Sequence, residues 1–162
     1  MIEFLSFGQG LFSLCEVIIM RKVDWIWHYV SNNAVCQECR EQIDGLPEYI
    51  CDAHTHGMNK YGHLEFQVVV DYGPQEIGRL LNEMGFKVQS GQRFKDGDQI
   101  EGLYLDCNIY LREVTDAHER PILRMVIPDK FNRLPEESER PHSLQMFATN
   151  FLYALGKNKN PS

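Results

Sequence analysis

Polar and apolar side chains alternate along several short stretches of the chain, and this period of two predicts β-strands. In residues 48–56 the odd positions carry Cys51, Ala53 and Thr55, which are expected to face the core. The even positions are mostly polar and are expected to face the opposite way. A run of three valines at 68–70 favours a well-buried strand. The five predicted strands span residues 48–56, 64–72, 100–105, 109–114 and 122–127.

Apolar side chains recur every three or four positions in four other stretches, and this spacing predicts helices. One of them starts at Pro74, a residue suited to the first helical turn, and is expected to end at Gly85 in a left-handed conformation. Asp24 is a plausible N-cap for a short helix that includes Trp25 and Tyr29. The predicted helices begin at Asp24, Ala34, Pro74 and Ser143.

These elements predict an α+β fold with about five mostly antiparallel strands, a central helix and helices near both termini. A tight turn at 106–108 is expected to join two of the strands into a hairpin. The 162 residues are enough for one domain, which we expect at 20–156, followed by a flexible tail at 157–162. Residues 1–19 are expected to be an optional extension, because Met20 is followed at once by two basic residues and a well-patterned segment.

The charge balance changes which partners we expect. The 23 acidic side chains outnumber the 16 basic ones, which gives a formal net charge of −7. Such a chain repels phosphate backbones and anionic lipid headgroups, so neither nucleic acid nor a membrane is an expected partner. Residues 1–19 lack the basic leader of a signal peptide and the uninterrupted apolar run of a membrane span. With five cysteines, an odd number, the chain is expected to be cytoplasmic with reduced thiols.

Two short motifs lie close together, HTHGM at 54–58 and GHLEFQ at 62–67. In this order they resemble a bacterial family known as domain of unknown function 4262. Further short matches continue in the same order, so the resemblance covers roughly residues 48–145. It implies a bacterial, cytoplasmic setting, and it implies no activity, substrate or catalytic residue.

Cysteine and histidine residues at short spacings predict where a metal ion could bind. Cys36 and Cys39 are separated by two residues, and so are Cys51 and His54. Two such pairs can complete the tetrahedral shell of a structural zinc ion. This arrangement requires Cys51 and His54 to share a side, which a regular strand over 48–56 does not allow.

A regular strand predicts a different cluster, because Asp52, His54 and His56 then project from one side. His63 can join them from the following loop. Such a set can hold zinc or another divalent ion with a bound water, as in a metal-dependent hydrolase. Glu65 is then the nearest candidate for the general base.

The same residues also predict a pocket that holds no metal, in which His54 and His56 hydrogen-bond to the loop backbone beside Gly57. Our first hypothesis is therefore a non-catalytic binding or regulatory module whose partner is an unknown protein or small molecule. Our second is a hydrolase that uses zinc at His54, His56 and His63. The pocket candidates are Asp52, His54, His56, His63, Glu65 and Gln67.

Overall fold

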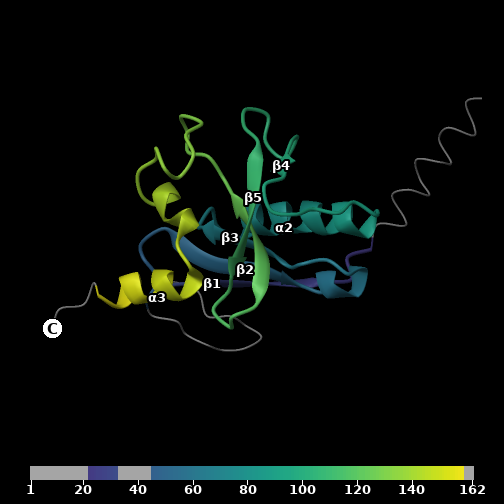
Figure 1. Ribbon diagram of the computed structural model, residues 1–162, viewed down its shortest axis with the longest axis horizontal. Coiled ribbons are helices and arrows are strands. Elements are labelled where there is room, and N and C mark those ends of the chain that lie inside the picture. The colour runs from purple at the N-terminus through teal and green to yellow at the C-terminus, as the bar shows by residue number, and fades with distance from the viewer. Residues whose placement is uncertain (1–21, 33–44, 159–162) are drawn as a thin grey trace, which may run out of the picture.

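The computed structural model describes residues 22–32 and 45–158. Within these residues, six strands form one mixed sheet in the order β1-β2-β3-β6-β5-β4 (Figure 1). β3 and β6 run parallel, and the other neighbouring pairs are antiparallel. The strands are β1 (Ile26–Ser31), β2 (Ile50–His56), β3 (Phe66–Val70), β4 (Gln99–Ile100), β5 (Ile109–Thr115) and β6 (Pro121–Val126). The helices are α2 (Pro74–Gln89) and α3 (Thr149–Lys157), with 3-10 turns η1 (Met58–Tyr61) and η2 (His142–Met146).

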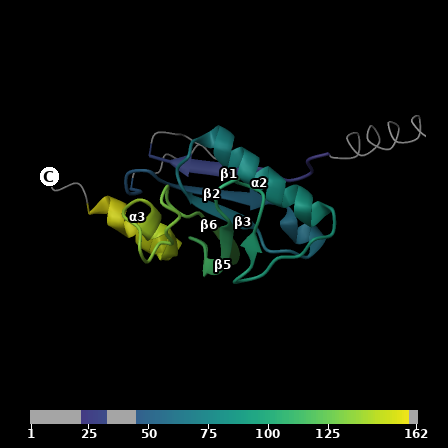
Figure 2. The same cartoon turned by 90° about the horizontal axis from the view of Figure 1, so that it is seen from above.

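Different helices cover the two faces of the sheet. α2 packs on one face, where the larger core includes Phe66 and Leu123. The other face packs against η2 and α3 around a smaller core that includes Val69 and Leu152. Figure 2 shows α2 and α3 on opposite sides of the central strands. This arrangement confirms the predicted α+β class, with six strands in place of about five.

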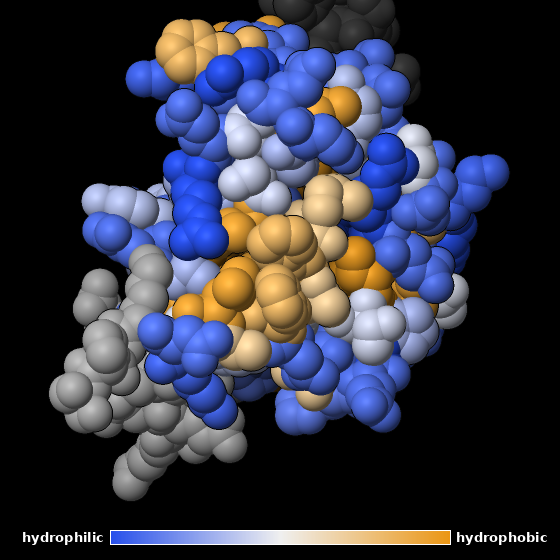
Figure 3. Space-filling model, turned by 60° about the vertical axis from the view of Figure 1, so that its left-hand side comes forward, coloured by the Kyte–Doolittle hydropathy of each residue, from blue (hydrophilic) through white to orange (hydrophobic). Residues whose placement is uncertain are grey.

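The outer surface of η2 and α3 carries several exposed apolar side chains. Met146, Phe147 and Phe151 are 39%, 39% and 50% exposed. The rings of Phe147 and Phe151 meet edge to face at 5.3 Å. Figure 3 shows apolar side chains gathered on this side of the molecule. No helix in the described part of the chain is long and apolar enough to cross a membrane.

The predicted helix beginning at Asp24 is wrong, because residues 26–31 form strand β1. All six residues of β1 pair with β2, from Ile26 opposite His56 to Ser31 opposite Cys51. The segment also alternates: Trp25, Trp27 and Tyr29 pack on the α2 side of the sheet. Pairing with β2 satisfies the backbone hydrogen-bonding groups along the whole segment. The strand period of two therefore prevails over the helical spacing of three to four.

The predicted end of the central helix at Gly85 is also wrong, because α2 continues to Gln89. Gly85 lies inside the helix against the ring of Trp25, where an added Cβ would be 2.4 Å from ring carbons. Gly78 packs in the same way against Trp27, at 2.6 Å. These two glycines therefore serve a close approach between α2 and β1.

The other predicted strands and helices differ less from the structure. β4 has only two residues and pairs with β5, so the hairpin closes over the longer connection at 101–108 and has no tight turn. The predicted helix from Ser143 is split, because Phe147 is extended between η2 and α3. The predicted extension at 1–19 and the helix from Ala34 lie outside the described residues.

Candidate functional site

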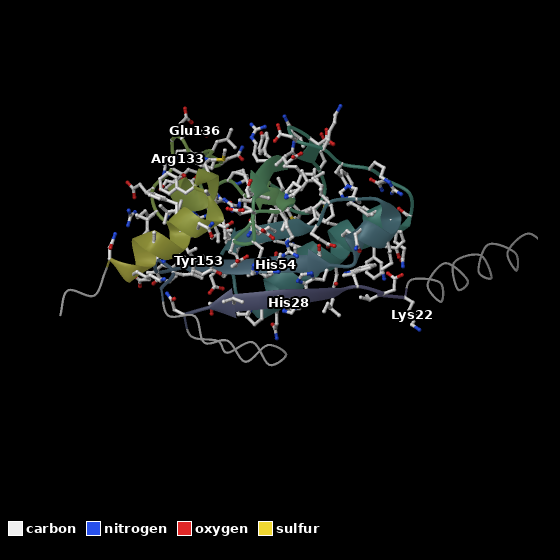
Figure 4. All side chains as sticks on the ribbon, turned by 60° about the horizontal axis from the view of Figure 1, so that its bottom comes forward. Lys22, His28, His54, Arg133, Glu136 and Tyr153 are labelled. Carbon is white, nitrogen blue, oxygen red and sulfur yellow. The ribbon has the colours of Figure 1, made fainter. Side chains whose placement is uncertain are left out.

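The face of the sheet opposite α2 carries a row of polar side chains across four strands. The strand register places His28 of β1 opposite His54 of β2, and His54 opposite Gln67 of β3. Gln67 in turn pairs with Arg124 of β6. In Figure 4, His28 and His54 lie side by side on neighbouring strands, consistent with their ring separation of 5.6 Å. We call the connected side chains of Arg124, Gln67, Asp52, His54 and His56 the polar row.

Arg124 anchors the buried end of this row, with no exposed surface. Its guanidinium donates to Gln67 Oε1 at 2.8 and 3.0 Å and to Thr149 Oγ1 at 2.9 Å. It also donates to the main-chain oxygens of Gln145 in η2 and of Phe147, which lies between η2 and α3. Burial lowers the pKa of Arg124 to about 10, with Asp52 acting in the opposite sense, so the side chain stays a cation at neutral pH.

Asp52 connects this cation to the histidines. It accepts hydrogen bonds from Gln67 Nε2 and Tyr153 OH, both at 2.9 Å, and contacts His54 Nδ1 at 3.2 Å. Burial acts to raise the pKa of Asp52, but the contacts with His54, Gln67 and Tyr153 outweigh it and the net shift is downward. Because a carboxylate can only accept, Nδ1 of His54 carries a proton and is the donor in its contact with Asp52.

His56 ends the row at the pocket. Its Nε2 lies 3.1 Å from Nε2 of His54, and its ring meets His28 edge-on at 4.6 Å. Burial lowers the pKa of His56, and the neighbouring imidazoles of His54 and His28 lower it further. His56 is therefore neutral at pH 7. His28, which packs beside the polar row, was not predicted as a site residue, because its segment was predicted as a helix.

A pocket of about 810 Å³ opens beside His54 and His56, where β2 ends and β3 and β6 begin. Its size is within the range of small-molecule sites. The apolar residues that line it are Val23, Trp25, Ile26, Leu64, Pro121 and Ile122. The polar or charged residues that line it are Asp24, His54, Thr55, His56, Asn59, Lys60, His63, Glu65, Asp116 and Arg120.

Glu65 lines the pocket, but its carboxylate is already hydrogen-bonded to main-chain N–H groups. It accepts from Thr55 Oγ1 at 2.7 Å and from the main-chain N–H groups of Gly57 and Met58 at 2.9 and 3.0 Å. Gly57 has φ +125°, a conformation that suits glycine. Glu65 therefore secures the sharp exit from β2, the role that we had predicted for the histidines.

The predicted convergence of His63 with His54 and His56 is wrong. Nδ1 of His63 donates to the carbonyl of Leu64 at 2.7 Å, and Nε2 accepts from the main-chain N–H of Phe94 at 3.0 Å. Its ring, only 8% exposed, packs against Phe66 at 5.1 Å. Both ring nitrogens are thus used within the fold, so neither can ligate a metal shared with His54.

The predicted structural zinc site, which needs Cys51 and His54 to bind the same ion, is also not formed. Cys51 has no exposed surface and faces the α2 side, whereas His54 faces the other side. Burial raises the pKa of the Cys51 thiol well above its usual range. Cys36 and Cys39 lie outside the described residues. Within residues 22–32 and 45–158, no three histidine, cysteine or carboxylate side chains are arranged to hold a metal ion.

Comparisons with known proteins gave no match. No protein-family model matches the chain, and no curated protein or solved structure is similar to it. The resemblance to domain of unknown function 4262 therefore stays a prediction.

Proposed function

We propose that this domain is a non-catalytic binding module that takes a small organic molecule in the pocket beside His54 and His56. The ligand has an apolar body and one hydrogen-bonding group. The apolar walls around Ile26 and Ile122 would bury the body. The neutral imidazole of His56 would recognise the polar group through Nδ1, because its Nε2 already shares a hydrogen bond with Nε2 of His54.

The observation that carries this proposal is that the charged groups of the pocket are already paired. Asp116 contacts Arg120 at 2.9 Å, and Asp24 contacts Lys60 at 3.4 Å. The third carboxylate, Glu65, holds the turn at Gly57. Each described carboxylate of the pocket is thus an acceptor within the fold. This supports recognition of a largely uncharged ligand more than general-base chemistry.

The hydroxyl of Thr55 supports the same conclusion. It donates to Glu65 at 2.7 Å and accepts from the main-chain N–H of Phe66 at 2.9 Å. A nucleophilic hydroxyl needs an adjacent base that can take its proton and a path to the substrate. The bonds of Thr55 hold strand β2 to β3 instead.

A protein-observed ¹H–¹⁵N NMR screen with a library of small organic fragments would test this function, with EDTA present to remove metal ions. Bound fragments should shift the amide signals of Gly57 and Ile122, which line the pocket. Ile26 is 48% exposed, so Ile26→Glu should fold normally. The added carboxylate must lose water when an apolar body binds, so affinity for these fragments should fall at least tenfold.

Leu105→Glu is the matched control, because Leu105 is fully exposed and does not line this pocket. It should leave fragment affinity unchanged. Fragments that bind elsewhere, or equally well to Ile26→Glu, would contradict the proposal. Metal-dependent hydrolysis of esters, amides or phosphoesters that disappears in His56→Ala would favour the hydrolase hypothesis instead.

A further inference from the structure

We infer that His54 and His56 form a two-nitrogen chelate for a divalent transition-metal ion such as Zn²⁺. The ion would lie between the two Nε2 atoms at the wall of the pocket, with its other coordination positions open to solvent. This site differs from the predicted ones, because it uses neither His63 nor a cysteine. The fragment screen contains EDTA, so its result does not depend on whether zinc binds here, and the two proposals can fail separately.

Strand geometry brings the two ligands together. His54 and His56 are at alternate positions of β2 and so project from one side of the strand. Their Nε2 atoms are 3.1 Å apart. Two nitrogens on a tetrahedral zinc ion, each about 2.0–2.1 Å from the metal, are separated by about 3.3 Å. Small rotations of the two rings therefore suffice to admit the ion.

The polar row prepares one of the ligands. Metal-bound histidines commonly donate their second ring nitrogen to a carboxylate, which fixes the tautomer and aims the lone pair. Asp52 occupies this position, 3.2 Å from Nδ1 of His54. Asp52 is itself held by Gln67 and Tyr153, so Nε2 of His54 is aimed by buried groups.

Both ligands can be reached from the pocket. His54 and His56 line it, and the side chain of His54 is 18% exposed. In the absence of metal, the two Nε2 atoms share a hydrogen bond that needs one proton between them. A divalent ion that binds both Nε2 atoms would take the place of that proton, which His56 would then carry on Nδ1 instead.

Zinc binding to the full chain, prepared without a histidine tag, tests this site. Zn²⁺ is added to EDTA-treated and desalted protein, and its affinity is measured by competition with a colorimetric zinc indicator. Histidine side-chain NMR of the wild type should show Zn²⁺ shifting Nε2 of both His54 and His56. His54→Ala and His56→Ala should each weaken the zinc affinity at least tenfold. His118→Ala, which removes an exposed histidine that does not line the pocket, should leave it unchanged.

Two further variants keep the result decisive. His56→Gln retains a hydrogen-bonding side chain and should also lose zinc affinity, even where His56→Ala folds poorly. Cys36→Ser/Cys39→Ser should bind Zn²⁺ like the wild type. The inference is overturned if the wild type binds no zinc, if the histidine variants bind it normally, or if only the cysteine variant loses it.

Discussion

Arg124→Met should lower the free energy of unfolding by about 3–5 kcal/mol, the largest effect that we expect from one substitution. Methionine fills much of the same volume but donates no hydrogen bond. Four acceptors would lose a donor at once: Gln67, Thr149 and two main-chain carbonyls. An unsatisfied buried acceptor costs about 1–3 kcal/mol, partly relieved by water or local adjustment. Urea unfolding followed by circular dichroism measures the change.

Arg112→Met is the matched control for this substitution. Arg112 lies directly opposite Arg124 in the β5–β6 pair but is partly exposed. Its replacement should change the free energy of unfolding by no more than about 0.5 kcal/mol. Equal effects from the two arginines would show that Arg124 does not hold the buried end of the polar row.

Gly85→Ala should destabilise the protein by about 2–3 kcal/mol, although alanine is the better helix former by about 1 kcal/mol. The new Cβ would lie 2.4 Å from ring carbons of Trp25, so α2 and β1 must move apart. Trp25 cannot simply turn away, because its Nε1 donates to Asn82 at 3.0 Å. Thermal and urea unfolding of the variant measure the loss.

A double-mutant cycle isolates this contact. Trp25→Leu removes the ring, so Gly85→Ala should cost much less in that background than in the wild type. Gln75→Ala, at an exposed position of the same helix, should have little effect. Strictly additive effects of the Trp25 and Gly85 substitutions would contradict the steric explanation.

The strands that were predicted correctly are those whose local pattern admits a single period. β3 and β6 contain apolar runs with β-branched residues, and β2 alternates regularly. β1 was missed because Trp25, Tyr29 and their neighbours fit both a helix and a strand. Pairing with β2, whose residues are 20 to 30 positions further along the chain, decided between them. The parallel contact of β3 with β6 likewise depends on distant segments.

The residues of the candidate site that lie on strand β2 could be predicted from the sequence, whereas those in the loop could not. Alternation along β2 correctly placed Asp52, His54 and His56 on one side. The loop residues His63 and Glu65 were harder to place, because nearby backbone groups compete for their side chains. Arg124 did give a signal in the sequence, as one charged residue within an otherwise apolar strand. Such a residue needs several buried acceptors, which only the folded chain identifies.

We propose that the polar row holds the imidazoles of His54 and His56 in fixed orientations at the pocket, with His56 neutral at pH 7. Long-range ¹H–¹⁵N spectra of the histidine rings, recorded over a pH series on the metal-free chain, test it most directly. We predict that His54 carries its proton on Nδ1, and that His56 titrates with a pKa below its ordinary value of 6.5. A proton on Nε2 of His54, or a His56 pKa at or above 6.5, would contradict the account.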